Sequence, residues 1–514
     1  MTRGLGLPVS AGLVAVAGLA QAVSLAAPWD GQARWWLQLL SLAVLAWQLG
    51  TAAGWRRGAL LAWLFAFAWL AGTFWWLYIS MHTYGGLPAP LAAAAMLALA
   101  AVLALYYGMA GALYVRLRPR NPAGQALLFA ALWLLAELAR GRWFTGFGWG
   151  GAGYAHVGGP LAGYASWIGV YGLSALSAWL SLTIATLWSG GVWRRVAVLA
   201  VITLPSVHQM AAAPTTQPTG SLDVALLQGN IPQDEKFQPG TGVATALRWY
   251  GQQLDEARDA LVVAPETAVP LLPQQLPDGY WDALRQRYAR GTQAALIGMP
   301  LGSYREGYTN SAVGLVPGQA PWRYDKHHLV PFGEFIPTGF KWFTAMMNIP
   351  LGDFNSGDVG QASLAWGGQR LAPNICYEDL FGEELGQRFA DAARAPTVFV
   401  NLSNIAWFGD TVAIDQHLAI SRMRALEFER PFVRATNTGA TAIIDHRGQV
   451  IAELPRLTRA VLRGAVEGRE GLTPYARWVA HAGLWPLWLA GLGVVLLAWR
   501  LGARVAPKRP AEAS

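Results

Sequence analysis

Eight apolar stretches, each close to the length needed to cross a bilayer, constrain this chain more than any other feature of its sequence. A membrane-spanning helix needs about 20 residues. The stretches cover residues 5–27, 34–54, 58–80, 87–115, 124–144, 160–189, 196–212 and 477–499. The seventh is the weakest because it is short and contains Pro205. We therefore predict a polytopic α-helical membrane domain of seven helices in residues 1–215, an eighth helix in 475–500 and a cytoplasmic tail in 501–514.

The composition agrees with a membrane protein. Hydrophobic residues make up 54% of the chain and charged residues only 13%, and the mean hydropathy is +0.29. Tryptophan, of which there are 26, favours membrane–water interfaces. Arg3 before the first apolar stretch is also typical of a signal peptide, but a second spanning segment follows almost at once. We therefore expect the first stretch to remain as a helix.

The positive charges predict an orientation in the membrane. The net charge of +8 does not form one dense patch, which argues against a nucleic-acid partner. Arginines and lysines instead occupy every second connection between apolar stretches, at Arg3, Arg56, Arg57, Arg116, Arg118, Arg120, Arg194, Arg195, Arg500, Arg504, Lys508 and Arg509. By the positive-inside rule, both termini are cytoplasmic. In a bacterium the chain would lie in the inner membrane, with the segment between the last two stretches in the periplasm.

That segment, residues 220–470, has the pattern of a separate α/β domain. Strand-like runs such as "LDVALLQGN", "LVVAPET" and "PTVFVNLSN" alternate with helical runs such as "TALRWYGQQLDEARDAL" and "IDQHLAISRMRALEFER". "GEELGQRFADAAR" predicts one more helix, and "ATAIIDHRGQVIAEL" a hairpin that turns at Arg447 and Gly448. Functional residues are expected where the strands end.

The single cysteine, Cys376 in "NICYED", follows one of these strands. One cysteine cannot form an intrachain disulfide, and a lone cysteine is more often a buried apolar residue than a nucleophile. Its position at the expected start of a helix would, however, favour the thiolate. A second strand end carries Glu266, in "VVAPET".

Lysine is rare in this chain, with four residues, and Lys326 stands in the Pro/Gly/aromatic-rich stretch "YDKHHLVPFGEFIP". Its ammonium is a compact cation that can stabilise an oxyanion. Glu266 could take the thiol proton and Cys376 could attack a carbonyl. His327 and His328 are rival bases, but adjacent residues of an extended segment point to opposite faces, so at most one could face the thiol.

Together, "APET", "KHHLVPFGEF" and "NICYED" resemble the Glu-Lys-Cys signature of the nitrilase superfamily. With the apolar segments, the chain resembles the membrane-integrated branch, the apolipoprotein N-acyltransferase family. Further similar stretches are "LLQGNIPQDEKF", "WFGD" and "ELARGRWFTGFGW". The resemblance implies a nitrilase-like αββα sandwich and catalytic residues Glu266, Lys326 and Cys376. It also implies a second essential glutamate at Glu334 and a supporting acid at Glu378.

The resemblance further implies the reaction. An acyl chain passes from a membrane phospholipid, through a cysteine thioester, to the α-amine of a diacylglyceryl-cysteine at the N-terminus of an apolipoprotein. No metal or other cofactor is expected, and we expect a monomer. Residues expected to contact the lipid substrates are Phe237, Trp407, Trp149, Trp75 and His82.

Some positions depart from the family pattern, and two other functions remain open. Ile405 stands where members commonly have an acid, Phe237 where they have Trp, and Gly148 where they have Pro. A membrane-bound nitrilase-type amidase would use the same three catalytic residues but pass the acyl group to water. A transporter with an accessory domain would need more ionisable residues within its spans than this chain has.

Overall fold

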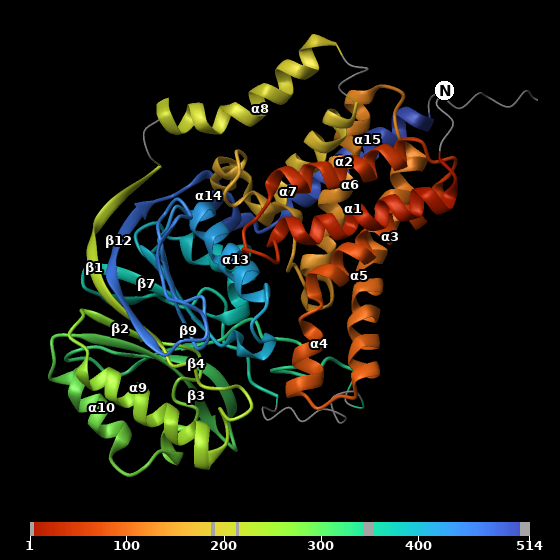
Figure 1. Cartoon of the computed structure of the whole chain (residues 1–514). Helices are drawn as coiled ribbons and strands as arrows, with labels where there is room; N and C mark the ends of the chain where they lie inside the picture. The colour runs from red at the N-terminus through yellow and green to blue at the C-terminus, as the bar shows by residue number, and fades with distance from the viewer. Residues whose placement is uncertain (1–4, 187–190, 212–214, 341, 343–352, 504–514) are drawn as a thin grey trace, which may run out of the picture.

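Each predicted apolar stretch is helical, the last as two helices, in the computed structural model, which describes residues 5–186, 191–211, 215–340, 342 and 353–503. Most of these helices pack into one bundle beside an α/β part (Figure 1). They are α1 (Leu7–Leu25), α2 (Trp35–Gly50), α3 (Trp55–Phe74), α5 (Ala89–Leu117), α6 (Pro122–Arg142), α7 (Ala165–Ala185), α8 (Val192–Ala211) and α15 (Trp485–Ala503). The C-terminal tail predicted for 501–514 lies mostly outside the described residues.

By length and apolar composition, five helices of the described chain can cross a membrane, or six if one bent pair crosses as a single span. Two of the eight predicted stretches fall short: α2 has 16 residues, and α8, which contains Pro205, is not among the five. In Figure 1, α8 lies at the edge of the bundle, where Val198 packs against it and Tyr164 donates its hydroxyl to the Val201 carbonyl at 3.0 Å. The helical part therefore has the length and apolar composition for five or six spans within the described residues.

The last apolar stretch, expected as one helix, is two helices bent by 88°. The first, α14 (Pro474–Ala482), ends at Gly483, whose φ of +52° is easy only for glycine, and α15 then begins at Trp485, with Pro486 as its second residue. Tyr475 and Val479 bury one face of α14 against the α/β part. The amphipathic half of the stretch thus packs on the sheet, and the all-apolar half runs along the bundle.

Two six-stranded sheets form the centre of the α/β part. The first has the order β12-β1-β2-β3-β4-β5 and the second β11-β10-β9-β8-β7-β6. The strands are β1 (Thr216–Gln228), β2 (Leu261–Ala264), β3 (Ala294–Ser303), β4 (Gly307–Leu315), β5 (Trp322–Asp325), β6 (Leu364–Trp366), β7 (Gln369–Ile375), β8 (Val398–Ser403), β9 (Phe432–Thr436), β10 (Ala442–Ile444), β11 (Val450–Glu453) and β12 (Ala460–Gly471). The predicted hairpin is β10–β11, an antiparallel pair.

The sheets pack face to face with helices outside, which gives the expected αββα layers. Apolar side chains of both sheets meet in one buried cluster. The outer face of the first sheet is covered by α9 (Ala244–Glu256) and α10 (Tyr280–Ala289), and that of the second by α13 (Ala413–Phe428) and α14. The helix expected over "GEELGQRFADAAR" is wrong: only Gly382–Gly386 is α-helical, followed by a 3-10 turn. Leu385 and Phe389 pack under the sheet there, and the chain must then turn at Pro396 to enter β8.

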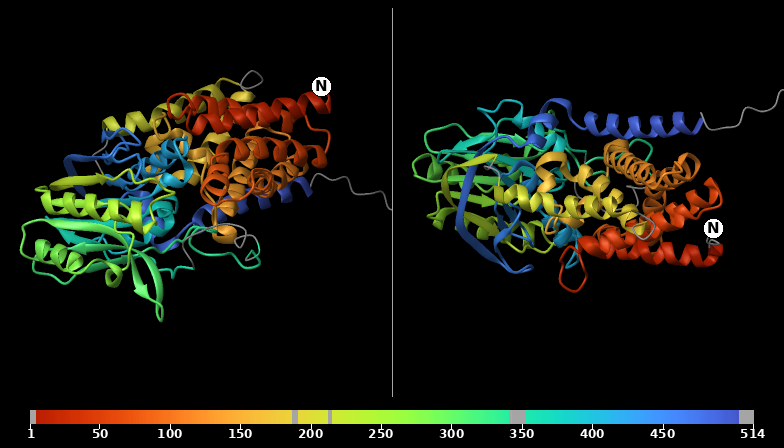
Figure 2. Two further views of the ribbon diagram at one scale, coloured as in Figure 1. Left: turned by 60° about the horizontal axis from the view of Figure 1, so that its bottom comes forward. Right: turned by 90° about the horizontal axis from the view of Figure 1, so that it is seen from above.

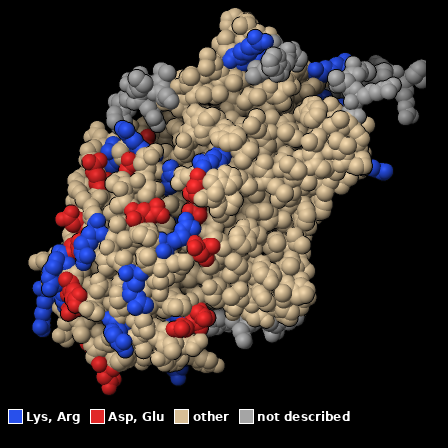
Figure 3. Space-filling view, viewed as in Figure 1, with Lys and Arg blue, Asp and Glu red and all other residues tan. Residues whose placement is uncertain are grey.

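Charge separates the two parts on the molecular surface. In the space-filling view the charged side chains lie over the α/β part, and the face over the helices is almost free of them (Figure 3). Seen from above, the start of α1 and the end of α15 both lie at the end of the bundle away from the sheets (Figure 2). This arrangement suits a bundle in the bilayer with the α/β part at one surface.

Candidate active site

The three predicted catalytic residues each follow a strand of the sandwich. Glu266 comes after β2 and Lys326 after β5 in the first sheet, and Cys376 comes after β7 in the second. The β7–β8 pair is parallel, with Ile375 beside Leu402, so the next residues, Cys376 and Ser403, are neighbours as well. The structure thus brings Glu266, Lys326 and Cys376 into one site, close enough for the three charges to act on one another.

Lys326 is enclosed by carboxylates. Its Nζ lies 2.9 Å from a Glu334 carboxylate oxygen and 3.4 Å from Glu266 Oε1, and only 1% of its surface is exposed. Asn310 Nδ2 donates to both carboxylates, at 2.7 Å each, and so holds them around the lysine. Burial opposes the charge of Lys326, but Glu334 and Glu266 outweigh it and raise the pKa of Lys326. The lysine is therefore a fixed ammonium.

Glu266 is fixed on both of its carboxylate oxygens. Oε1 faces Lys326 and Asn310, and Oε2 accepts the backbone N–H of Asn404 at 2.8 Å. Glu334 is held in turn by the backbone N–H of Val330, at 2.8 Å. Both carboxylates thus have set positions before any substrate binds, which is the geometry expected for a proton acceptor and its support.

Cys376 has a strained backbone and a high pKa. Its φ of +53° is in the left-handed region that non-glycine residues rarely adopt. Its side chain is partly exposed. Burial and the negative charge of Glu266 raise the pKa of the Cys376 thiol to about 12, against the opposing effect of Lys326. The prediction that a helix terminus would favour the thiolate is therefore wrong: only a 3-10 turn, Cys376–Leu380, follows, and burial together with Glu266 outweighs the groups that favour the thiolate.

Glu378 ties the nucleophile segment to the lysine segment. Its carboxylate accepts the backbone N–H of Ile375 at 2.6 Å and of His327 at 2.6 Å, the residues next to Cys376 and Lys326. Tyr324 donates its hydroxyl to both oxygens, at 2.8 and 2.9 Å. Burial raises the pKa of Glu378, against these donors. Glu378 thus sets the spacing of Cys376 and Lys326 rather than facing the reaction itself.

A buried polar network under the nucleophile was missed by the sequence analysis. His417 Nε2 lies 3.2 Å from the Cys376 carbonyl oxygen and 3.0 Å from Asp379 Oδ1. Arg434 donates to Asp379 at 3.2 Å and to His417 Nδ1 at 3.1 Å. Burial alone would raise the pKa of Asp379, but His417 and Arg434 lower it. The stretch "QHLAISRMRALEFER" could have indicated this network, because charged residues recur among apolar ones on a helix that packs against a sheet.

His327 and His328, the rival bases, both have other partners. His327 Nδ1 lies 2.7 Å from the Gly357 carbonyl oxygen. His328 Nδ1 lies 3.1 Å from both carboxylate oxygens of Glu384, and its ring stacks on Phe381 at 3.5 Å between centroids. Neither ring makes a described hydrogen bond to the thiol, so Glu266 is the better-placed base.

Comparison with known proteins agrees with this geometry. Residues 17–183 match the family model for the apolipoprotein N-acyltransferase N-terminal domain, and residues 223–475 match the carbon-nitrogen hydrolase model. An apolipoprotein N-acyltransferase of Verminephrobacter eiseniae is 61% identical over 91% of this chain and 92% of its own. The chain belongs to the apolipoprotein N-acyltransferase family. Members from Ralstonia nicotianae and Bordetella bronchiseptica are 48% and 41% identical, covering 86% and 97% of this chain and the same shares of their own.

Two of the residues expected to contact lipid have different surroundings in this family member. Trp149 is buried, and its indole N–H donates to Gln416 Oε1 at 2.8 Å. Trp76 donates to the same oxygen at 3.1 Å, so the two indoles join the helical part to α13. Trp75, in contrast, is 44% exposed. Trp149 is therefore positioned as a structural link, and Trp75 as a surface residue of the helical part.

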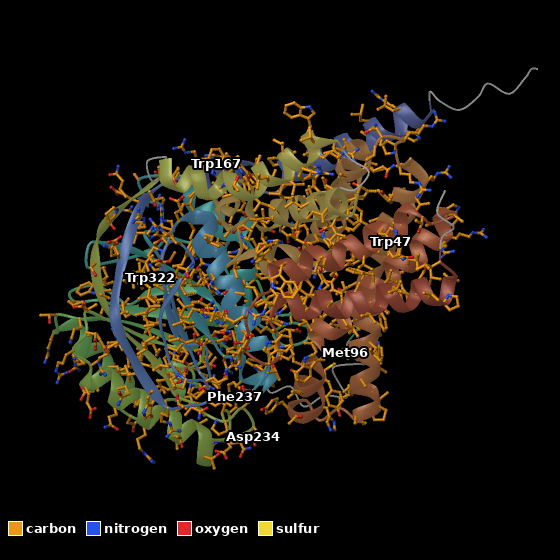
Figure 4. The ribbon with its side chains drawn as sticks, turned by 45° about the horizontal axis from the view of Figure 1, so that its top comes forward. Trp47, Met96, Trp167, Asp234, Phe237 and Trp322 are labelled. Atoms are coloured by element: carbon orange, nitrogen blue, oxygen red, sulfur yellow. The ribbon has the colours of Figure 1, made fainter. Side chains whose placement is uncertain are left out.

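The other three residues expected to contact lipid, His82, Trp407 and Phe237, lie on short turns and loops of the helical part and of the α/β part. His82 is in the π-helical turn Ser80–Tyr84, and its Nδ1 lies 2.8 Å from the Leu87 carbonyl oxygen. Tyr84 of that turn meets the Trp407 ring edge-on at 6.2 Å. Phe237 is half-buried beside Asp234, on the loop that follows β1 (Figure 4).

The positions that depart from the family pattern leave the catalytic contacts in place. Ile405 is buried in the cluster shared with the helical part. Gly148 lies in a loop that Arg140 holds by donating to the carbonyls of Phe147 and Trp149, at 2.6 and 2.7 Å. Arg140 thus braces this loop.

Proposed function

We propose that this protein moves an acyl chain from a membrane phospholipid to the α-amine of a diacylglyceryl-cysteine at the N-terminus of an apolipoprotein. The observation that carries the proposal is that the nucleophile adjoins the helical part. Tyr377, the residue after Cys376, donates its hydroxyl to the Gly146 carbonyl at 3.1 Å, and its ring stacks with Phe147 at 6.4 Å. A cysteine acyl carrier placed against a membrane bundle suits long-chain substrates.

In the first half-reaction, Glu266 takes the thiol proton as Cys376 attacks the ester carbonyl of the phospholipid. The high pKa of Cys376 means that the thiol is protonated at rest, so proton removal accompanies attack. The Lys326 ammonium stabilises the oxyanion of the tetrahedral intermediate. The lysophospholipid leaves with the proton from Glu266, and the thioester remains.

In the second half-reaction, the α-amine of the acceptor attacks the thioester carbonyl. Glu266 accepts the proton that the nitrogen loses, and Lys326 stabilises the second oxyanion. Collapse forms the amide and expels the Cys376 thiolate, which regains a proton from Glu266. No atom of the enzyme is consumed, and one site serves both steps because both intermediates carry charge at the same carbonyl oxygen.

The membrane part avoids the cost of lifting acyl chains into water, about 0.8 kcal/mol per CH₂. We propose eight spans, with a membrane domain in 1–215, a periplasmic catalytic domain in 220–470 and a last helix in 475–500, and we expect a monomer. Both termini are cytoplasmic and the membrane is the bacterial inner membrane. The position of the start of α1 and the end of α15 at the same end of the bundle supports this topology.

The aromatic loops above the site are proposed to receive the acyl chains. Trp407 with Tyr84, and Phe237 on the loop after β1, lie on segments next to Glu266 and its partner Asn404. Trp75 and His82 belong to the segment of the helical part that reaches these loops. Phe237 keeps the aromatic surface at a position where family members commonly have Trp, so apolar contact with a chain is retained.

The test separates acyl loading from transfer. The purified full chain is incubated with phospholipid vesicles and its intact mass is measured, and a diacylglyceryl-cysteine peptide is then added. We expect a gain of one acyl group that Cys376→Ala abolishes, and loss of that group to the peptide as an amide. Absence of the mass gain, or peptide acylation by Cys376→Ala, contradicts the mechanism. Release of free fatty acid in place of acyl peptide identifies a hydrolase.

A further inference from the structure

A second lysine, Lys236, lies in the active site and was missed by the sequence analysis. It is one of four lysines in the chain, on the loop after β1, and is 2% exposed. Its Nζ donates to the backbone carbonyl of Glu266 at 3.1 Å. Within the described residues no carboxylate lies within 4.0 Å of Nζ, so this buried ammonium lacks the close ion pair that Lys326 has.

The loop that carries Lys236 is held firmly over the site. Gln233 accepts a hydrogen bond from the Asn404 side chain at 2.8 Å, and the backbone N–H of Asn404 in turn contacts Glu266. Gly242 packs so closely on this loop that an added Cβ would lie 2.1 Å from the Glu235 carbonyl oxygen. Lys236 is therefore placed by the fold beside Glu266 and is not a surface side chain that happens to reach inward.

The charges that face the thiol do not balance without Lys236. The charged side chains that act most strongly on Cys376 are the carboxylates of Glu266 and Glu334 and the ammonium of Lys326. The Arg434 guanidinium, which also interacts with Cys376, is offset by its ion pair with Asp379 at 3.2 Å. Two negative charges and one positive charge leave one excess negative charge, which opposes formation of a thiolate or an oxyanion. A Lys236 ammonium cancels that excess. Glu266 and Cys376 are the charged groups that act on Lys236, and both favour its charged form.

We propose that Lys236 is the second cation of this active site, a positioning residue that holds Glu266 through its carbonyl and offsets the negative charge that forms at Cys376. The inference deepens the proposed acyl transfer and rests on it for its biological role. Burial, opposed by Glu266 and Cys376, lowers the pKa of Lys236 to about 8. The second cation is consequently present at neutral pH and lost in mildly alkaline solution.

The test is the rate at which iodoacetamide alkylates Cys376 in the detergent-solubilised full chain, from about pH 6 to about pH 10. Because Cys376 is the only cysteine, intact mass reports its modification without interference. We expect the wild-type rate to rise about tenfold per pH unit, flatten between about pH 8 and pH 9 as Lys236 loses its proton, and then rise again. Lys236→Met should react about tenfold more slowly below pH 8, with no flattening.

Two further variants keep the result interpretable. Lys236→Arg keeps its charge at every pH, so it should show no flattening and should react faster than wild type above about pH 9. Arg258→Met, which removes an exposed cation, should match wild type. A wild-type profile without flattening, or Lys236→Arg and Lys236→Met profiles that both match wild type, overturns the proposal. Because alkylation needs no lipid, failure of acyl loading with these profiles intact would contradict the proposed function alone.

Discussion

Replacing Glu378 with Gln should loosen the active site without touching a reacting atom. The carboxylate accepts backbone N–H groups from Ile375 on one oxygen and from His327 on the other, both at 2.6 Å. An amide has only one acceptor oxygen. In either orientation its NH₂ group faces one of these N–H groups, so one of the two tethers is lost.

The size of the effect follows from the contacts of Glu378. Loss of a hydrogen bond to a charged group, with a buried donor left unpaired, costs about 3 kcal/mol. Part of this is recovered, because burial raises the pKa of Glu378 and thus disfavours its charge, and the amide carries none. A net cost of about 2 kcal/mol should lower the Tm of a domain of this size by about 4–8 °C. Because a displacement of about 1 Å at a reacting group can cost about 100-fold in rate, acyl loading should slow by about 10- to 100-fold.

The assay combines thermal unfolding in detergent with the rate of acyl-mass gain from phospholipid. Tyr324→Phe is the matched control, since it removes a hydroxyl donor to the same carboxylate and leaves both backbone tethers. It should cost about 1 kcal/mol and leave loading within about threefold of wild type. Wild-type loading by Glu378→Gln, or equal defects in the two variants, refutes the view that Glu378 sets the spacing of the nucleophile and the lysine.

Three other substitutions test separate parts of the site. Glu334→Gln removes the nearer ion pair of Lys326 and should slow acyl loading about tenfold or more; unchanged loading would show that Glu266 alone positions the lysine. Burial and Glu384 raise the pKa of Glu383 from 4.5 to about 7. The protonated Glu383 therefore stabilises the folded state below about pH 4.5, and this contribution, up to about 3 kcal/mol, is lost as the pH rises through 7. The Tm of wild type should therefore fall between about pH 5 and pH 8, and Glu383→Gln should reduce that fall; an identical fall contradicts the assignment. Gln416→Leu leaves two buried indole N–H groups without their acceptor and should lower the Tm by several degrees, as followed by tryptophan fluorescence, whereas an unchanged Tm would mean that the link is not stabilising.

The fold was largely predictable because its strongest signals are local in sequence. Apolar length alone located every helix of the bundle, and strand-like runs located β1, β2, β7, β8 and the β10–β11 hairpin, whereas no run predicted β4, β5, β6, β9 or β12. The prediction failed where packing overrides local preference. The stretch 477–499 is apolar enough for one helix, yet Tyr475 and Val479 are drawn onto the sandwich and the helix breaks at Gly483. The acidic segment after Cys376 has helical composition but is shortened by the burial of Leu385 and Phe389.

The catalytic side chains were predictable from motif and resemblance, but their electrostatics were not. Cys376 was expected to gain thiolate character from a helix terminus, whereas burial and then the carboxylate of Glu266, far away in sequence, raise its pKa. Lys236 drew no attention because nothing in "QDEKF" indicates burial, which only the packing of the loop after β1 creates. In both cases burial and contacts with residues far away in sequence, rather than residue type, decide the pKa.

The contacts beside Cys376 also argue that the α/β part does not hold its site alone. The residue after Cys376, Tyr377, bonds to the Gly146 carbonyl of the helical part. His417, which contacts the Cys376 carbonyl, adjoins Gln416, the acceptor for two indoles of the helical part. Removal of the bundle would thus free both sides of the strained nucleophile turn as well as expose its apolar contact face. The membrane part is therefore a structural component of the active site. Its contacts with Tyr377 and Gln416 hold the turn that carries Cys376 beside the helices that would bind the lipid substrates.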